Sequence, residues 1–278
     1  MGSNRHYPEE RPAHEANVGA FWMDVHPVTS AEFAVFVAAT GYLTVAERAP
    51  SAELYPGVTA DRLVPGSAVF RQPAGPVDLA DPAQWWAYVP GADWRHPDGP
   101  GSTTSGREAH PVVHVAFDDA VGYATWVGKR LPTEPEWEFA ARGGLAGAEY
   151  CWGDRLVVDG RVPANVWRGE FPWRSDKLRP PGTEPVGCYP PNGYGLHDMA
   201  GNVWEWTSDG YRPGHDSPCC APPPVDPAAP SVPLMVVKGG SYLCAENYCS
   251  RYRPAARIPH AADTSTGHLG FRCVSSGP

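Results

Sequence analysis

Reactive side chains concentrate in one short stretch, residues 237–253, which holds two thiols, two serine hydroxyls, three tyrosines and two guanidiniums. Cys244 and Cys249 are five positions apart, and Ser241 precedes them. On an ideal helix, residues five apart point about 140° away from each other, so these thiols can share a ligand only if the chain turns or is extended between them. The preceding Gly239-Gly240 permits such an irregular backbone.

Two converging thiolates suit a soft ion of low coordination number, such as Cu(I), better than zinc. Zinc normally takes four ligands, or three and a water, and no second Cys or His pair lies nearby in the sequence. A structural disulfide or two buried thiols are equally compatible with the spacing. The spacing alone leaves these alternatives open.

The composition predicts a loop-rich fold with little regular secondary structure. Of 278 residues, 42% are hydrophobic and 11% aromatic, which is enough for a sizeable core. We favour one domain over residues 1–278, with two small domains as the alternative. The 33 Pro, 30 Gly and 11 Trp resist long helices. A net charge of −9 argues against nucleic-acid partners and against an anionic membrane surface.

The seven cysteines indicate a reducing compartment. They stand at positions 151, 188, 219, 220, 244, 249 and 273, and an odd number cannot pair completely within one chain. The sequence shows no N-terminal apolar region typical of a signal peptide and no apolar run of about 18 residues. We therefore expect a cytoplasmic protein without a membrane span. Cys219 and Cys220 lie in a Pro-rich stretch and have no assigned role.

Local patterns predict the elements of the first third of the chain. Residues 18–25 have strand propensity, and residues 31–40 form a short amphipathic helix that follows a cap at Thr29 and Ser30 and stops at Gly41. Residues 49–111 are interpreted as a long ordered excursion, packed by the aromatic cluster at residues 84–88. A linker between two domains is the alternative.

Two further helices are expected in the middle of the chain. Residues 110–115 look like a strand, and a helix beginning at residues 117–120 has the face Val121, Ala124, Thr125, Val127 and Gly128. The clearest helix follows the cap residue Thr133, has Pro135 and Glu136 in its first turn and ends at Gly143.

No motif for hydrolysis or phosphate binding is present. The sequence has no His-Glu-x-x-His, no G-x-S-x-G and no phosphate-binding G-x-x-x-x-G-K-[ST]. His110 and His114 are therefore given no catalytic role. Asp198 and Glu205 flank a glycine-containing turn, an oxygen-rich arrangement that Ca²⁺ takes. The alternative is a turn before an aromatic core strand, with solvated carboxylates.

A set of motifs carries a family resemblance. In chain order they are Arg130-Leu131-Pro132-Thr133-Glu134-Pro135-Glu136-Trp137-Glu138, Asn192-Gly193-Tyr194-Gly195-Leu196, Gly201-Asn202-Val203-Trp204-Glu205-Trp206, Gly239-Gly240-Ser241 and Gly270-Phe271-Arg272-Cys273. In that order they resemble the formylglycine-generating enzyme (sulfatase-modifying factor) superfamily, from about His6 to Val274. Members of this superfamily have different functions, but the Ser241-x-x-Cys244-x-x-x-x-Cys249 core resembles the true formylglycine-generating enzymes.

The resemblance implies an α+β fold, a single compact loop-rich domain related to C-type lectins, and an aerobic reaction. In that family a cysteine within a sulfatase Cys-x-Pro-x-Arg motif is oxidised to Cα-formylglycine, with O₂ as oxidant and Cu(I) held by two thiolates. The copper ligands and catalytic residues carried over are Cys244 and Cys249, with Ser241 beside the metal. The residues expected to line the substrate groove are Trp204, Arg251, Ser265 and His268. The partner would be an unfolded sulfatase polypeptide.

The resemblance also implies structural calcium. One ligand set would be Asn165, Val166, Asp176 and Leu178, and the other Asp198, Gly201, Val203 and Glu205. Glu10 is an additional candidate.

The sequence departs from the family pattern at several positions. Ala245 stands where some members carry His, so no imidazole can act there. The disulfide partners of eukaryotic members align with Ala124, Ala141 and Pro254, which leaves Cys273 unpaired. The spacing between Phe171 and Gly182 also differs from the family pattern.

The residue types fit copper chemistry. Cu(I) between two thiolates has room for a third sulfur, so a substrate thiolate can join it, and a positive rim from Arg251 or Arg253 favours the thiolate form. The substrate would lie extended in the groove. One rival, a sulfoxide synthase-like non-haem iron enzyme, needs a set of histidines and a carboxylate. The other, a non-catalytic C-type-lectin-like binding module, has no need for Ser241, Cys244 and Cys249 together.

Overall fold

A mixed sheet from the C-terminal half of the chain forms the centre of the computed structural model, which describes residues 1–215, 224–227 and 229–277. Its strands are β6 (Trp204–Gly210), β7 (Val225–Asp226), β8 (Ala229–Lys238), β9 (Arg257–Ala261) and β10 (Leu269–Gly270). β8 pairs antiparallel with β6, β7 and β9, whereas β10 runs parallel to β6. This parallel pair places Leu269 beside Trp204 and so brings the loop before β10 to the beginning of β6.

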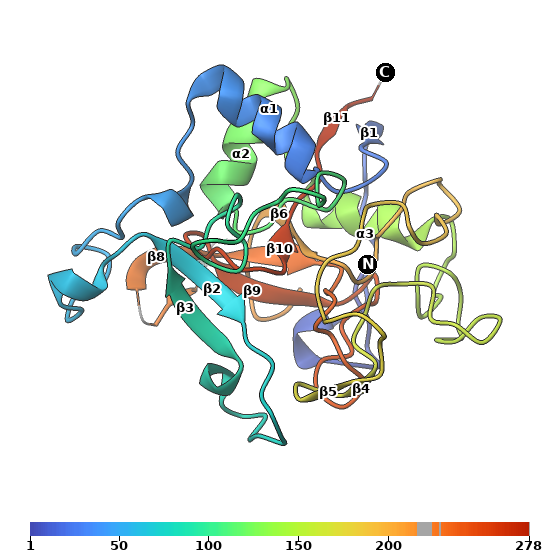
Figure 1. Cartoon of the computed structure of the whole chain (residues 1–278). Coiled ribbons are helices and arrows are strands. Elements are labelled where there is room, and N and C mark those ends of the chain that lie inside the picture. The colour runs from blue at the N-terminus through green and yellow to red at the C-terminus, as the bar shows by residue number, and fades with distance from the viewer. Residues whose placement is uncertain (216–223, 228, 278) are drawn as a thin grey trace.

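The helices are short, as the composition predicts. They are α1 (Ser30–Thr40), α2 (Phe117–Trp126) and α3 (Glu134–Arg142), and Figure 1 shows α1 and α2 together on one side of the sheet. The Thr29 side chain accepts a hydrogen bond from the Glu32 N–H, and Gly41 ends α1 in the left-handed conformation with φ 70°. The predicted helix is therefore confirmed and begins one residue earlier.

The helix predicted after Thr133 is also confirmed. The Thr133 hydroxyl accepts from the Glu136 N–H, the Glu136 carboxylate accepts from the Thr133 N–H, and Gly143 terminates α3 with φ 54°. These contacts join residues three apart, so the local sequence favours them without help from distant segments. Packing of α3 against β6 and β8 then fixes the helix on the sheet.

Around α2, the predicted strand over residues 110–115 is wrong, and the predicted helix is confirmed with a face that is right only in part: Ala124 is buried and Val127 packs against the core. His114 has a positive φ of 59°, which interrupts any strand over residues 110–115, and Pro111 makes only an isolated bridge to Thr29. The buried face of α2 includes Asp119 and Tyr123, while Val121 is 38% exposed. Asp119 turns inward because its carboxylate accepts from the backbone N–H groups of Ala116 and Val45.

Short strand pairs and 3₁₀ turns complete the fold. β1 (Phe21–Met23) lies within the predicted residues 18–25 and pairs with β11 (Val274–Ser276); β2 (Gly66–Phe70) pairs with β3 (Trp86–Pro90), and β4 (Gly169–Glu170) with β5 (Arg174–Ser175). The 3₁₀ turns are η1 (Pro8–Glu10), η2 (Val45–Glu47), η3 (Ala60–Arg62) and η4 (Pro82–Gln84). Each of the three pairs is antiparallel.

The excursion at residues 49–111 packs onto the thiol-bearing segment, so the alternative of a linker is wrong. Trp85 is 1% exposed and belongs to a buried cluster with Trp167, Phe171, Tyr242 and Leu243. Its ring lies 5.4 Å from the rings of Phe171 and Tyr248. The aromatic residues of the excursion therefore cover one side of the segment that carries Cys244.

Two cationic side chains in the interior, Lys238 and Arg272, are paired with carboxylates. Lys238, fully buried on β8, lies 3.1 Å from a carboxylate oxygen of Glu138 on α3, and Arg272 forms a two-pronged pair with Glu205. Removing one partner of such a pair is strongly destabilising because the other charge stays buried. The result is a single compact α+β domain. None of the described helices has both the length and the apolar character needed to cross a membrane.

Candidate active site

The two thiols of the reactive stretch converge. The Sγ atoms of Cys244 and Cys249 are 3.3 Å apart, and the residues are 2% and 9% exposed. The chain turns between them because the N–H groups of Tyr248 and Cys249 both donate to the Ala245 carbonyl. The turn needed for a shared ligand is thus present, and the thiols are free because a disulfide would hold the sulfurs at about 2.05 Å.

The surroundings of the pair favour one thiolate and one thiol. The hydrogen bond with Cys244, followed by the Arg251 guanidinium, lowers the pKa of Cys249 to about 7 despite burial. Burial, and then the neighbouring Cys249, raise the pKa of Cys244 well above its ordinary value. The Ser241 backbone N–H donates to the Cys244 sulfur at 3.4 Å. Cys249 is therefore the more readily ionised of the two.

The N-terminal segment holds Arg251 at the thiols. The contact between this segment and Arg251 could not be seen in the sequence. Nη1 of Arg251 lies 3.8 Å from the Cys249 sulfur, while Nη2 donates to Glu9 at 2.6 Å. The Tyr7 ring lies 3.6 Å from the central guanidinium carbon. The nearest signals in the sequence were the adjacent acids Glu9 and Glu10 and the basic pair Arg251 and Arg253, but nothing in the sequence indicated that they pair.

Glu10, an additional calcium candidate, has a different partner. Its carboxylate accepts two hydrogen bonds from Arg253, at 2.6 and 2.9 Å, and both side chains are almost fully buried. The carboxylate thus neutralises a buried guanidinium. Glu10 does not fit the expected calcium role in this arrangement.

Ser241 and His268 form the second polar contact of the site. The Ser241 hydroxyl lies 2.9 Å from Nδ1 of His268 and accepts from the Leu243 N–H at 3.2 Å. Burial, with smaller effects from His260 and His114, lowers the pKa of His268 well below its ordinary value. The imidazole is therefore neutral near pH 7, and the Trp86 ring packs against it at 4.8 Å.

The other two expected groove residues are buried. Ser265 is 8% exposed, and its hydroxyl donates to Ser67 Oγ at 2.9 Å. Trp204 is 1% exposed and belongs to the main core, and its backbone N–H donates to the His268 carbonyl. Trp204 was expected to line the substrate groove, and in this structure its side chain is buried in the main core. It instead supports the loop that carries His268.

The first expected calcium set does not fit its role. The Lys177 ammonium donates to Oδ1 of Asn165 and lies 3.6 Å from a Glu184 oxygen, so a lysine already meets the side-chain oxygen that the ion would need. The Asp176 side chain is 60% exposed, and Leu178 is fully exposed. Val166, which was expected to contribute its carbonyl, is buried.

The second expected calcium set retains two buried carboxylates. Burial raises the pKa of Asp198, and the negative charge of Glu205 adds to the shift. Glu205 accepts from Arg272 at both oxygens and from Nε1 of Trp137, which leaves one oxygen with a single donor. Gly201 and Val203, which lie between these two carboxylates in the sequence, are both buried. Because Glu205, like Glu10, already neutralises a buried guanidinium, Asp198 is the carboxylate of this set that remains for a hard cation.

The dithiol fits a soft metal. Two buried sulfurs in contact, one of them readily ionised, are the donor type that Cu(I) prefers. Within residues 1–215, 224–227 and 229–277, no group of three or more His, Cys, Asp or Glu side chains is arranged to hold a metal ion. The ligands available for copper are therefore Cys244 and Cys249.

The fold and the site together define a class: a loop-rich α+β domain with a buried, unequal pair of thiols close to its surface. The chain belongs to the family described as the sulfatase-modifying factor enzyme 1-like domain, since the family's sequence profile matches residues 1–276. The match confirms the resemblance carried by the motifs.

Relatives cover nearly the whole chain. The formylglycine-generating enzyme of Mycobacterium tuberculosis (strain ATCC 25618 / H37Rv) is 56% identical over 99% of this chain and 94% of that protein. The enzyme of the same name from Streptomyces coelicolor is 47% identical over 96% of this chain and 81% of that protein. A Mus musculus protein named inactive Cα-formylglycine-generating enzyme 2 is 38% identical over 96% of this chain and 79% of that protein.

Solved structures share the fold at low sequence identity. PvdO from Pseudomonas aeruginosa has a TM-score of 0.63 at 21% identity, covering 99% of this chain and 90% of that chain. CarF has a TM-score of 0.54 at 19% identity, covering 93% of this chain and 87% of that chain. These likenesses concern the arrangement of the backbone alone.

Proposed function

We propose that this chain is a copper-dependent oxidase that converts a cysteine in a sulfatase Cys-x-Pro-x-Arg motif to Cα-formylglycine. The observation that carries the proposal is the contact between the Cys244 and Cys249 sulfurs, 3.3 Å apart, beside the Ser241–His268 pair. The relatives named formylglycine-generating enzyme support it. Relatives from Mus musculus and Bos taurus are named inactive, so membership of the family does not by itself establish the activity.

The overall change balances as follows. The substrate CH₂–SH group becomes an aldehyde, the sulfur leaves as H₂S, and one O₂ takes up two electrons and two protons from a thiol reductant to yield the aldehyde oxygen and one water. A Cu(I) ion bound by the two thiolates would supply the one-electron and oxygen chemistry. The protein must position the substrate thiol and take its proton.

Residues of the chain account for these tasks. The hydrogen bond with Cys244 and the guanidinium of Arg251, which is anchored on Glu9, favour the ionised form of the Cys249 sulfur. The Ser241 N–H donates to the Cys244 sulfur and fixes its direction. The neutral His268, whose pKa is lowered by burial, contacts the Ser241 hydroxyl at Nδ1 and holds it beside the thiols. Trp85 and Leu243 pack beside the segment and restrict water.

The partner in this proposal is an unfolded sulfatase segment that lies extended against the site. The cysteines at positions 151, 188, 244, 249 and 273 carry no disulfide, which suits a reducing compartment such as the cytoplasm. Calcium at Asp198, Gly201, Val203 and Glu205 would be structural, because this set includes neither thiol.

The decisive experiment combines metal analysis with turnover. Protein loaded with Cu(I) without oxygen is given O₂, a reductant and a Cys-x-Pro-x-Arg peptide, and the aldehyde is detected by mass loss and hydrazide capture. Cys244→Ser and Cys249→Ser should each lose copper and activity, because a hard hydroxyl cannot replace a soft thiolate. Cys151→Ser, a thiol outside the site whose contact with the Met199 carbonyl a hydroxyl can replace, is the control. If the copper-loaded protein oxidises no such peptide, the chain is a binding module.

A further inference from the structure

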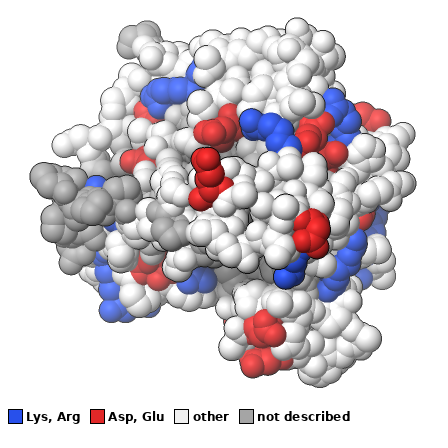
Figure 2. Space-filling model, turned by 90° about the vertical axis from the view of Figure 1, so that its left-hand side faces the viewer, with Lys and Arg blue, Asp and Glu red and all other residues white. Residues whose placement is uncertain are grey.

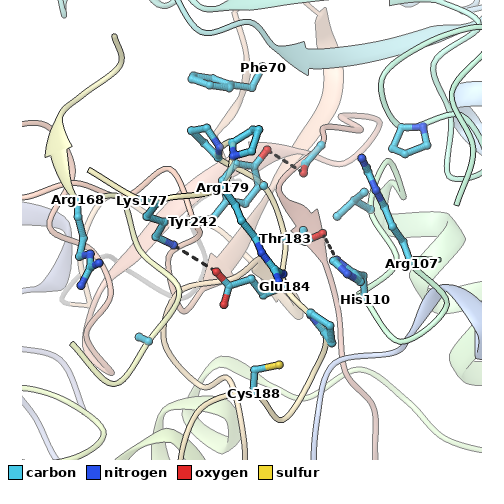
Figure 3. Close-up of a pocket in the computed structure, with 18 of the residues that line it drawn as sticks. Phe70, Arg107, His110, Arg168, Lys177, Arg179, Thr183, Glu184, Cys188 and Tyr242 are labelled. Carbon is cyan, nitrogen blue, oxygen red and sulfur yellow. Dashed lines mark hydrogen bonds and ion pairs between the residues drawn. The ribbon is translucent and has the colours of Figure 1, made fainter. Parts of the chain in front are cut away.

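A large basic cavity lies next to the reactive segment. Its volume is about 870 Å³, and Figure 3 shows the side chains that line it. The wall comprises the end of β2, the segment around His110, the loop at residues 161–189, and Tyr242 with Gly267. This volume falls within the range of about 300–1,000 Å³ typical of binding pockets.

Positive charge dominates the cavity although the chain is acidic. Its charged lining residues are five cations and two carboxylates: Arg107, Arg161, Arg168, Lys177 and Arg179, with Asp98 and Glu184. The whole chain has the opposite balance, 22 Lys and Arg against 31 Asp and Glu. On the face in Figure 2, by comparison, acidic and basic side chains are scattered among uncharged ones. The cavity is thus a local reversal of the overall charge.

The two carboxylates are already paired. Asp98 lies 3.4 Å from Arg107, and Glu184 lies 3.6 Å from Lys177, a contact drawn in Figure 3. Within the described part of the chain, the guanidiniums of Arg161, Arg168 and Arg179 have no hydrogen-bond or ion-pair partner. Three unpaired guanidiniums around one cavity favour an anionic ligand.

The spread of the cations indicates the shape of that ligand. In Figure 3, Arg168 and Arg107 lie on opposite sides of the cavity, with Lys177 and Arg179 between them. A compact oxyanion needs donors that converge on one point, whereas separated cations suit several negative groups along an extended chain. Phe70 and Tyr242 add aromatic surface for the chain between those groups.

The cavity shares its wall with the reactive centre. Tyr242 follows Ser241 and Gly267 precedes His268, and the Tyr242 hydroxyl donates to the Gly267 carbonyl at 3.3 Å. The Ser241 and His268 side chains are themselves in contact at 2.9 Å. An extended polypeptide with a residue at the thiols therefore has other residues within reach of the cavity.

From this arrangement we infer that the cavity binds an acidic stretch, several Asp or Glu residues, of the same polypeptide that presents the cysteine, outside the Cys-x-Pro-x-Arg motif. This inference rests on the proposed function and adds a feature of the substrate class. Polyphosphate chains such as nucleic acid carry similarly spaced charges, but the net charge of −9 opposes their approach over longer distances. A flanking acidic segment of a few residues is affected mainly by charges within about 10 Å.

Binding tests the cavity independently of turnover. A fluorescent peptide with four consecutive Asp or Glu residues and no cysteine is titrated with metal-free full-length protein, and anisotropy is measured at low and high salt. Arg168→Ala/Arg179→Ala should weaken binding at least about tenfold, since each lost charge-assisted contact is worth about that factor. Arg155→Ala removes an exposed arginine outside the cavity and should change nothing. The inference is overturned if the wild-type protein does not bind the acidic peptide, or if both variants lose affinity equally. It is also overturned if a single-stranded oligonucleotide binds more tightly than the peptide.

Turnover then separates the inference from the function. The copper-loaded protein is given the motif peptide with an acidic extension and the same peptide with a neutral Ser extension. We expect the acidic extension to lower KM about tenfold, with little change in kcat, and the double variant to lose that preference. If the neutral peptide is converted and the acidic extension gives no advantage, the docking inference fails while the proposed function stands. If neither peptide is converted, the proposed function fails, and the binding experiment alone decides the cavity.

Discussion

The hydroxyl of Ser241 lies 2.9 Å from Nδ1 of His268, and this contact joins the thiol-bearing segment to the loop before β10. The His268 carbonyl in turn accepts from the Trp204 N–H, so the contact is anchored on the first residue of β6. Ser241 is fully buried, and its N–H faces the Cys244 sulfur. One residue therefore contacts both a thiol and a neutral imidazole.

Ser241→Ala should retain copper and turn over more slowly. The substitution keeps the backbone N–H at Cys244 and removes only the hydroxyl that contacts His268. A loss of about 10-fold to 100-fold in kcat is expected for a supporting polar contact. Metal analysis and steady-state kinetics on the motif peptide check this. Loss of copper in this variant would contradict the assigned role.

Glu9→Gln should weaken copper binding although Glu9 is 235 positions away from Cys244 in sequence. The carboxylate receives two hydrogen bonds from Arg251, and without its charge the guanidinium is less firmly held near Cys249. We expect a loss of about tenfold in Cu(I) affinity, measured by competition with a chelator, and slower alkylation of Cys249 in metal-free protein. Glu15→Gln, the same change at an exposed position, is the control. Equal affinities of the two variants would remove Glu9 from the site.

Cys151, Cys188 and Cys273 should be dispensable for turnover. Cys188 is exposed, so Cys188→Ser should change the free energy of unfolding by less than about 0.5 kcal/mol. Cys151 is buried with its thiol 3.5 Å from the Met199 carbonyl, a contact that Ser can replace. Cys273 is fully buried, so Cys273→Ser should cost about 1–3 kcal/mol by burying a hydroxyl. Urea unfolding and activity assays test each of the three Ser variants. A variant that is inactive although its stability is normal would contradict the prediction that these thiols are dispensable.

Glu138 should make stability depend on acid pH. Burial alone would raise the pKa of Glu138, but Lys238 and Arg142 outweigh it and lower the pKa to about 2 from 4.5. Because the folded-state pKa is depressed, the stabilisation is present above pH 4.5 and is lost as the pH falls toward 2. It amounts to roughly 3 kcal/mol.

Urea unfolding at several pH values between 7 and 3 checks this prediction. Glu138→Gln should be less stable at pH 7 by about 3–5 kcal/mol, because Lys238 stays buried, and its stability should fall less steeply below pH 4.5. Glu170→Gln, an exposed carboxylate in a weak surface pair, is the control and should follow the wild type. Parallel pH curves for wild type and Glu138→Gln would exclude Glu138 as the source.

Calcium should raise the melting temperature through the second ligand set only. Binding to the native state adds about 2.7 kcal/mol of stability when free Ca²⁺ is one hundred times its Kd. Asp198→Asn should abolish the response, whereas Asp176→Asn should keep it, because Asp176 is exposed and Lys177 contacts Asn165. Thermal unfolding with and without a chelator measures this. No response in the wild type would refute the calcium proposal.

Short-range interactions explain why much of the fold could be predicted. The capping boxes at Thr29 and Thr133 and the stops at Gly41 and Gly143 depend on residues within one or two helical turns, so the sequence alone specifies α1 and α3. The motifs specified the family, whereas the interval from Cys244 to Cys249 showed only that the thiols cannot converge on a regular helix.

Only the tertiary structure decided what surrounds those thiols. Glu9 reaches Arg251, Lys177 meets Asn165, and the cavity gathers cations from separate segments, all through packing that no local pattern encodes. The same holds for His114, whose left-handed backbone ends a local strand pattern. Backbone hydrogen bonds between near neighbours are determined by adjacent residues, whereas contacts between distant segments depend on how the whole chain buries its apolar surface and pairs its charges.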